Sequence, residues 1–163
     1  MNIKIVTAVG EGSTSLASFD CALQNAGVSN YNLIPLSSVI PPNSTVEVVE
    51  KYTTPEEDFG KRLYVVKAEQ RSKRVGDCIG AGIGWYQLED GRGFFVEHEL
   101  HGHDRLEVEN SLKKLIMNTL ADMCRFRKIQ FESEKVNAAF SVEVAKHEFT
   151  CALSIAIYRQ EDW

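Results

Sequence analysis

The chain of 163 residues has no long apolar run, no basic cluster and no closely paired cysteines. No apolar run approaches the ~18 residues of a membrane-spanning helix. The opening residues, MNIKIVTAVGEGS, lack the apolar core and cleavage site of a signal peptide. The net charge is -5 and no Lys/Arg-rich run stands out, which argues against a nucleic-acid partner. We therefore expect a cytoplasmic protein that binds neither membranes nor nucleic acid.

The four cysteines are scattered and form no CxxC pair. This spacing is typical of reduced core thiols in a cytosolic protein. The residues are Cys21, Cys78, Cys124 and Cys151.

A dinucleotide-binding fingerprint is also missing, although GAGIG at 80–84 resembles one. Its spacing is GxGxG, and it lies inside a strand-like run rather than between a strand and a helix. Because residues two apart share one face of a strand, the three glycines predict the close approach of a neighbouring element.

The order of the predicted elements indicates an α+β fold in one domain. Helical spacing of apolar residues predicts a helix from about Ser15 to Gly27 and a longer one over 104–125. The remaining apolar runs come in groups, as expected for a layered αββα sandwich with mainly antiparallel sheets. The predicted strands are 2–9, 31–36, 45–50, 62–69, 77–87, 93–100, 129–144 and 148–158, and 51–60 is predicted to be a polar loop.

The stretch EHELHGH, which starts at Glu97, holds three of the four histidines. Glu97, His98, His101 and His103 suggest one alternative function, a metal-dependent hydrolase. Strand alternation, however, puts the two carboxylates on one face and His98 on the other, and no HExxH pattern is present. The pattern favours a solvated strand end, with Glu97 as a candidate proton donor beside Phe95.

A strand-like run ends in Ser37-Ser38 and is followed by Pro41-Pro42. On the first helix, Asp20 lies at the margin of the apolar stripe, where a carboxylate either stabilises the helix or binds a cation. Neither feature by itself indicates a reaction.

Together, residues 16–42, LASFDCALQNAGVSNYNLIPLSSVIPP, resemble the signature of the pyruvoyl-dependent arginine decarboxylases, roughly LNAFDxALxxAGIxNxNLxxxSSIxPP. The resemblance implies that the chain cuts itself between Ser37 and Ser38, leaving residues 1–37 and 38–163 associated. Ser38 would become a covalent pyruvoyl group, the only cofactor expected. Asn32 would donate a hydrogen bond to the Ser37 carbonyl during cleavage.

The resemblance further implies conversion of L-arginine to agmatine and CO₂ through a Schiff base on the pyruvoyl group, for polyamine synthesis or acid resistance. Glu97 would return a proton to Cα, Asp20 would bind the guanidinium, and Leu23 would line the same pocket. The family forms trimers, sometimes paired into hexamers, with active sites between subunits. No metal is expected.

Departures from the family pattern leave the substrate less certain than the reaction. Ser15 and Ala17 replace the usual Pro and Asn, Val39 replaces Ile, and Trp85 is unusual in the Gly/Ala strand. Lysine or histidine is therefore an alternative substrate, although the carboxylate of Asp20 favours a cationic side chain. A further alternative is an unprocessed, non-catalytic trimeric protein of the same fold.

Overall fold

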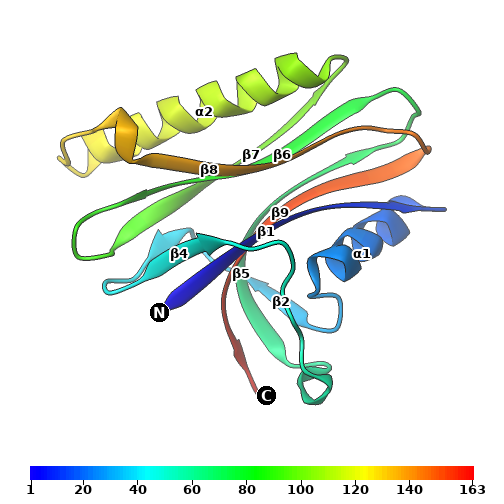
Figure 1. Cartoon of the computed structure of the whole chain (residues 1–163), viewed down its shortest axis with the longest axis horizontal. Helices are drawn as coiled ribbons and strands as arrows, with labels where there is room; N and C mark the ends of the chain where they lie inside the picture. Colours follow the sequence, from blue (N-terminus) through cyan, green and yellow to red (C-terminus); the bar gives the residue numbers. More distant parts are fainter.

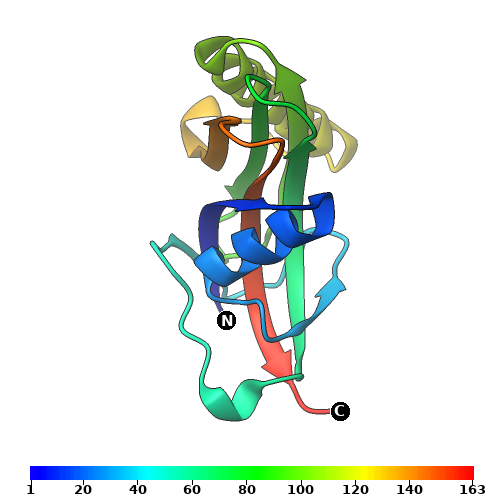
Figure 2. The ribbon, with the colours of Figure 1, turned by 90° about the vertical axis from the view of Figure 1, so that its right-hand side faces the viewer.

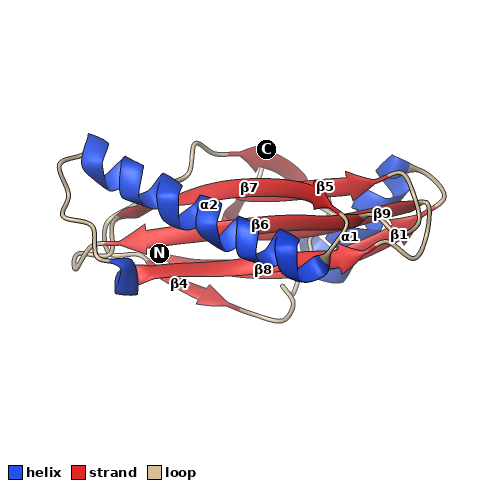
Figure 3. Ribbon diagram, turned by 90° about the horizontal axis from the view of Figure 1, so that it is seen from above, coloured by secondary structure: helices blue, strands red, loops and turns tan.

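The computed structural model describes all 163 residues as two stacked β-sheets with one helix on each outer face (Figure 1). Helix α1, Ser15–Ala26, packs on the five-stranded sheet, and helix α2, Arg105–Phe126, covers the four-stranded sheet (Figure 3). The predicted αββα sandwich is therefore confirmed. Neither helix is apolar enough over a sufficient length to cross a membrane.

The five-stranded sheet is mixed. Its central strands β5, β9 and β1 are antiparallel, whereas the two edge strands run parallel to their neighbours. In spatial order the strands are β2 (Asn32–Pro35), β5 (Arg62–Ser72), β9 (Phe149–Glu161), β1 (Asn2–Gly12) and β4 (Thr45–Val48).

The four-stranded sheet is antiparallel throughout. Its first strand, β3, is only two residues long and pairs with the start of β7. In spatial order the strands are β3 (Val39–Ile40), β7 (Gly93–Gly102), β6 (Cys78–Gln87) and β8 (Val136–Val144).

Alternation along the strands divides the core into layers. The largest apolar cluster lies between the two sheets and includes Ile5, Ile83 and Phe95. A second cluster lies under α1, and two smaller ones lie under α2. Figure 2 shows α1 crossing the outer face of β9 and β5. The central strands β6 and β9 are thereby buried on both faces over most of their length.

The three glycines of GAGIG form the face of β6 on which α2 rests. A Cβ atom added to Gly84 would lie 2.1 Å from Cγ2 of Ile116. A Cβ added to Gly80 would lie 2.7 Å from Cγ1 of Val108, also on α2. The prediction of a closely approaching element is confirmed, and α2 is that element.

Hydrogen bonds at the helix ends agree with the sequence signals. The Thr14 side chain accepts a hydrogen bond from the Ala17 N–H, and Gly27 ends α1 with a φ of 85°. At α2 the Asp104 carboxylate accepts a hydrogen bond from the Glu107 N–H at 2.8 Å.

One predicted strand begins too early. The strand predicted over 129–144 begins only at Val136, because the preceding residues form a connection with a 3₁₀ turn at Ser133–Lys135. The polar loop predicted at 51–60 contains a 3₁₀ turn, Glu56–Asp58, whose last residue is buried. Tyr31 donates a hydrogen bond to the Asp58 carboxylate at 2.6 Å, which offsets the burial of that charge.

Candidate active site

The segment around Ser37 and Ser38 carries the chain from one sheet to the other. Before it, β2 belongs to the five-stranded sheet, and the Leu36 N–H still donates to the Val65 carbonyl at 2.8 Å. After it, β3 belongs to the four-stranded sheet, where Val39 pairs with Phe94. The peptide bond between the serines is therefore held from both sides by different layers of the fold.

Ser38 has a backbone conformation that residues with a side chain rarely adopt. Its φ is 66°, in the left-handed region. This conformation costs a non-glycine residue roughly 1–2 kcal/mol. The Phe95 N–H donates to the Ser38 carbonyl at 2.8 Å and thereby helps to hold it. Strain of this kind is concentrated at functional sites.

The Ser38 hydroxyl donates a short hydrogen bond to the carboxylate of Glu97. Glu97 lies on β7 opposite Ile83 of β6, on the same strand face as Phe95, so its side chain points between the sheets. Both partners of the hydrogen bond are partly buried. The two residues singled out as catalytic in the sequence, 59 positions apart, thus meet within one chain.

Tyr158, at the end of β9, was missed in the sequence. Its hydroxyl donates to the Val39 carbonyl at 3.0 Å, and its ring packs edge-on against Phe95 at 6.0 Å between centroids. Burial, reinforced by the negative charge of Glu97, raises the pKa of Tyr158 well above its usual value. Its only sequence signal is an inward-facing position in the final apolar strand, which an ordinary core residue would share.

Asp20 and Leu23 lie on α1, on the far side of the five-stranded sheet from Glu97. Asp20 is exposed to solvent, whereas Leu23 is 7% exposed and packs in the cluster beneath the helix. The Ser38–Glu97 pair instead lies on the inner side of that sheet. Within one chain the structure does not bring Asp20 or Leu23 to Ser38.

Asn32 also lies apart from the serines. Its side-chain amide donates to the Gly60 carbonyl at 2.6 Å. At about 3.3 Å per residue of extended chain, its Cα lies roughly 16 Å from that of Ser37. An asparagine side chain cannot span this distance, so Asn32 does not reach the Ser37 carbonyl of its own chain.

The histidines of EHELHGH point in different directions. His98 faces α2 and bonds to the Thr119 hydroxyl at 2.9 Å, whereas His101 contacts the buried carboxylate of Asp77 at 3.0 Å. The structure contains no group of three or more histidine, cysteine or carboxylate side chains arranged to hold a metal ion. The four residues proposed for a hydrolase therefore do not converge.

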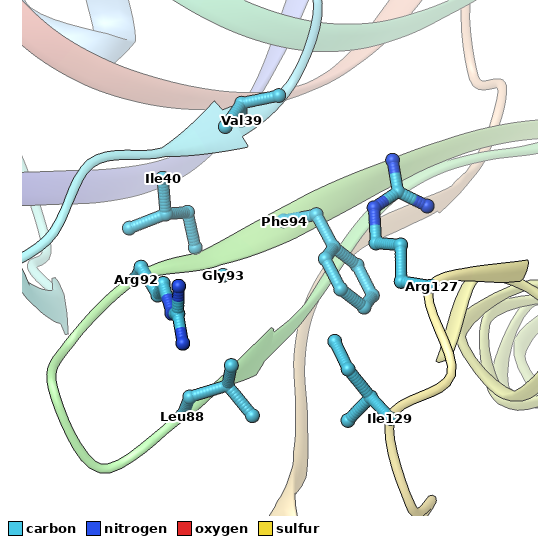
Figure 4. A pocket seen from close by; sticks show the side chains of 8 residues that line it. All are labelled: Val39, Ile40, Leu88, Arg92, Gly93, Phe94, Arg127 and Ile129. Carbon is cyan, nitrogen blue, oxygen red and sulfur yellow. The ribbon is translucent and has the colours of Figure 1, made fainter. Parts of the chain in front are cut away.

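A groove of about 340 Å³ lies beside β3, and the two residues that follow Ser38 in the sequence form part of its lining (Figure 4). It is lined by Val39, Phe94 and other apolar side chains, with the guanidinium groups of Arg92 and Arg127 at its sides. Ser38 and Glu97 do not line it. Two positive charges would repel the side chain of a cationic amino acid, so this groove is a poor site for arginine.

Comparison with known proteins gives a match that covers almost the whole chain. Residues 2–162 match the family described as pyruvoyl-dependent arginine decarboxylase. The chain belongs to this family. The family predicted from the sequence, one of pyruvoyl-dependent lyases that carry a covalent pyruvoyl group, is thereby confirmed.

Three relatives named pyruvoyl-dependent arginine decarboxylase illustrate the similarity. The protein of Methanopyrus kandleri is 30% identical over 155 residues, which are 94% of this chain and 93% of that one. The protein of Methanothermobacter thermautotrophicus is 37% identical over 116 residues, 71% and 73% of the two chains. The protein of Halobacterium salinarum is 38% identical over 96 residues, which cover only 58% of either chain.

The residues around Ser38 fit the formation of the family's covalent group. A serine hydroxyl lies against a carboxylate that can take its proton, and the preceding peptide bond ends at a residue held in a strained conformation.

All four cysteines are free, and three of them are buried, so no disulfide bond constrains the chain.

Proposed function

We propose that this protein cleaves its own chain between Ser37 and Ser38 and then converts L-arginine to agmatine and CO₂. The observation that carries the proposal is the hydrogen bond from the Ser38 hydroxyl to Glu97, made at a residue with a φ of 66°. Membership of the arginine decarboxylase family supports the choice of reaction.

Self-cleavage begins with the Ser38 hydroxyl. A bond forms between its oxygen and the Ser37 carbonyl carbon, the bond from that carbon to the Ser38 nitrogen breaks, and the hydroxyl proton ends on the freed amine. Glu97 is placed to carry this proton. The Cα of residue 38 then loses its proton as the bond between its Cβ and the ester oxygen breaks, which releases the Ser37 carboxylate and leaves a dehydroalanine. The imine tautomer of this dehydroalanine adds water and loses ammonia, which leaves the ketone of the pyruvoyl group at residue 38. A strained, immobilised segment favours the first step, because attack on an amide needs a fixed geometry.

A donor to the Ser37 carbonyl oxygen would stabilise the negative charge that develops on it. If Asn32 is this donor, it acts on another copy of the chain, since extended strand separates it from its own Ser37. Asn32 is solvent-exposed, as such a role requires.

The two pieces stay together after cleavage because residues 1–37 form part of the core. Strand β1 pairs with β9 from Lys4 to Gly12 and with β4 from Asn2 to Ile5. Ile3 and Ile5 of this piece are fully buried between the sheets. We therefore treat residues 1–163 as a single domain composed of two chains.

The ketone carbonyl of a pyruvoyl group draws electrons from the bond between Cα and the carboxylate of an amino acid. Glu97, next to residue 38, would return a proton to Cα. Asp20 would hold the guanidinium through two parallel hydrogen bonds, a geometry that selects arginine over lysine. Leu23, buried one turn further along α1, would support this part of the helix from beneath.

These roles require sites shared between copies of the chain, since Asp20 and Glu97 lie on opposite sides of the five-stranded sheet. Both sheets offer an open edge on the side of Ser38. Strand β2 pairs with β5 only from Arg62 to Val65, and β3 pairs with β7 only at Gly93 and Phe94. We propose a trimer, or a hexamer made of two such trimers, in the cytoplasm, in which another copy packs against these edges.

An intact-mass spectrum and a denaturing gel test the proposal. The protein should separate into residues 1–37 and 38–163 and should release agmatine and CO₂ from L-arginine faster than it acts on L-lysine. The Ser38→Ala protein, which lacks the attacking hydroxyl, should remain a single 18.3 kDa chain. Persistence of the wild-type protein as one uncleaved chain without decarboxylase activity contradicts the proposal.

A further inference from the structure

Tyr158 is the side chain of the five-stranded sheet that holds the segment downstream of the cleavage position. Its hydroxyl donates to the carbonyl of Val39, which belongs to the four-stranded sheet. The preceding carbonyl, that of Ser38, accepts a hydrogen bond from the Phe95 N–H on β7. Two consecutive carbonyls after the scissile bond are thus held from opposite layers of the sandwich.

The position of Tyr158 in β9 coincides with an irregularity of the strand. The pairing of β9 with β5 passes from Ile157 opposite Val65 directly to Arg159 opposite Tyr64, so Tyr158 has no partner in β5. A bulge of this kind re-aims a side chain, and bulges are over-represented beside active sites. Here the irregularity falls at the residue whose hydroxyl reaches across the layer to β3.

We propose that Tyr158 is a positioning residue for self-cleavage, which holds Ser38 in the conformation from which its hydroxyl attacks. This inference rests on the proposed function. With the Ser38 and Val39 carbonyls both held, the peptide unit after Ser38 cannot rotate, and Ser38 is kept at a φ of 66° with its hydroxyl against Glu97. Without the Tyr158 hydroxyl, one of these two hydrogen bonds is lost and Ser38 relaxes more easily to an ordinary conformation.

The role belongs to the first step only. There the bond between the Ser38 oxygen and the Ser37 carbonyl carbon forms, and the bond from that carbon to the Ser38 nitrogen breaks. Tyr158 exchanges no proton, because its hydroxyl is already engaged with the Val39 carbonyl. Burial and the nearby charge of Glu97 raise the pKa of Tyr158, so the hydroxyl remains a donor near neutral pH.

The experiment follows cleavage of freshly translated full-length chains on a denaturing gel. In Tyr158→Phe the ring and its packing against Phe95 remain, and only the hydrogen bond is lost. The matched control is Tyr86→Phe, since Tyr86 is 1% exposed and its hydroxyl also donates to a backbone carbonyl, that of Gln130, at 3.1 Å. Replacing Tyr158 by 4-aminophenylalanine restores an N–H donor at the same place.

Tyr158→Phe should cleave about five- to tenfold more slowly than wild type, the rate equivalent of one hydrogen bond. The 4-aminophenylalanine variant should recover most of the rate. Tyr86→Phe should cleave at the wild-type rate, although its thermal unfolding midpoint should fall by about as much as that of Tyr158→Phe. Hydroxylamine, which cuts esters far faster than amides, should also cleave Tyr158→Phe more slowly, because less ester has formed.

Equal cleavage rates for Tyr158→Phe and Tyr86→Phe would overturn the inference. Slow cleavage with unreduced hydroxylamine sensitivity would also overturn it, because the ester would then form normally and a later step would be affected. Failure of the proposed function looks different, since the wild-type chain itself would then remain uncut, and the inference would fall with it. If Tyr158→Phe does not fold, the absence of rescue by the 4-aminophenylalanine variant decides against the inference.

Discussion

Replacing Glu97 by glutamine is the sharpest test of the proposed chemistry. Glutamine has nearly the shape of glutamate and keeps an oxygen that can accept the hydrogen bond from residue 38, so the sandwich should remain intact. It cannot, however, bind or release a proton near neutral pH. General acid–base catalysis typically contributes 10²–10⁴-fold to a rate, which is about 2.7–5.5 kcal/mol of activation free energy. We expect kcat for arginine to fall by roughly this factor.

The substrate affinity should change much less. Glu97 points between the sheets toward residue 38, whereas the proposed guanidinium ligand, Asp20, lies on α1. KM should therefore stay within about threefold of the wild-type value, and the loss should appear in kcat. Cleavage is expected to slow as well, because the Glu97 carboxylate accepts the hydrogen bond from the Ser38 hydroxyl that attacks. The rate must be expressed per cleaved chain, with the ketone content titrated by a carbonyl reagent.

A neighbouring carboxylate provides the control. Glu99 lies on the same face of β7 two residues further on and is exposed. Glu99→Gln removes the same charge from the same strand face and should leave kcat per ketone unchanged. If Glu97→Gln retained wild-type kcat per ketone, the assignment of Glu97 as the proton donor would be refuted. An equal loss in both variants would indicate a general effect of charge rather than a specific proton transfer.

Two further predictions concern residues away from Glu97. Asp20→Asn should raise KM for arginine about tenfold or more, because it removes the charge of a bidentate pair. Cleavage, followed on a gel, should proceed as in wild type, and impaired cleavage would show that Asp20 has been given the wrong role. Gly84→Ala should lower the free energy of unfolding by about 1–3 kcal/mol in urea titrations, because the new methyl group overlaps Ile116. The double variant with Ile116→Ala should be less destabilised than the sum of the two single changes, and simple additivity would argue against the contact.

The helices and the face of β6 were accessible from the sequence because their signals are local. Thr14 and Gly27 cap α1 through hydrogen bonds to residues within a few positions. The alternating glycines at 80–84 predicted a close neighbour because strand geometry alone puts them on one face. What these patterns did not contain was the identity of the neighbour, α2.

Strand β3 could not be predicted. Two residues, Val39 and Ile40, give no periodic signal, and they are in a strand only because β7 offers them a pairing edge. The start of β8 was misjudged for a related reason. Residues from 129 onward are apolar enough for a strand, but Ile129 and Phe131 pack under α2 without entering the sheet.

The sequence by itself determined the family, because Ser37-Ser38 and the surrounding signature are contiguous, and the resemblance singled out Ser38 and Glu97 as candidate catalytic residues. Only the tertiary structure decided how that pair is held. Which strands become neighbours determines where the chain crosses between the sheets and why Ser38 has a left-handed conformation. It also determines the hydrogen bond from Tyr158 to Val39 and the separation of Asp20 from this segment. Neighbours in a sandwich are selected by packing over long sequence separations, and no local pattern of residues encodes that selection.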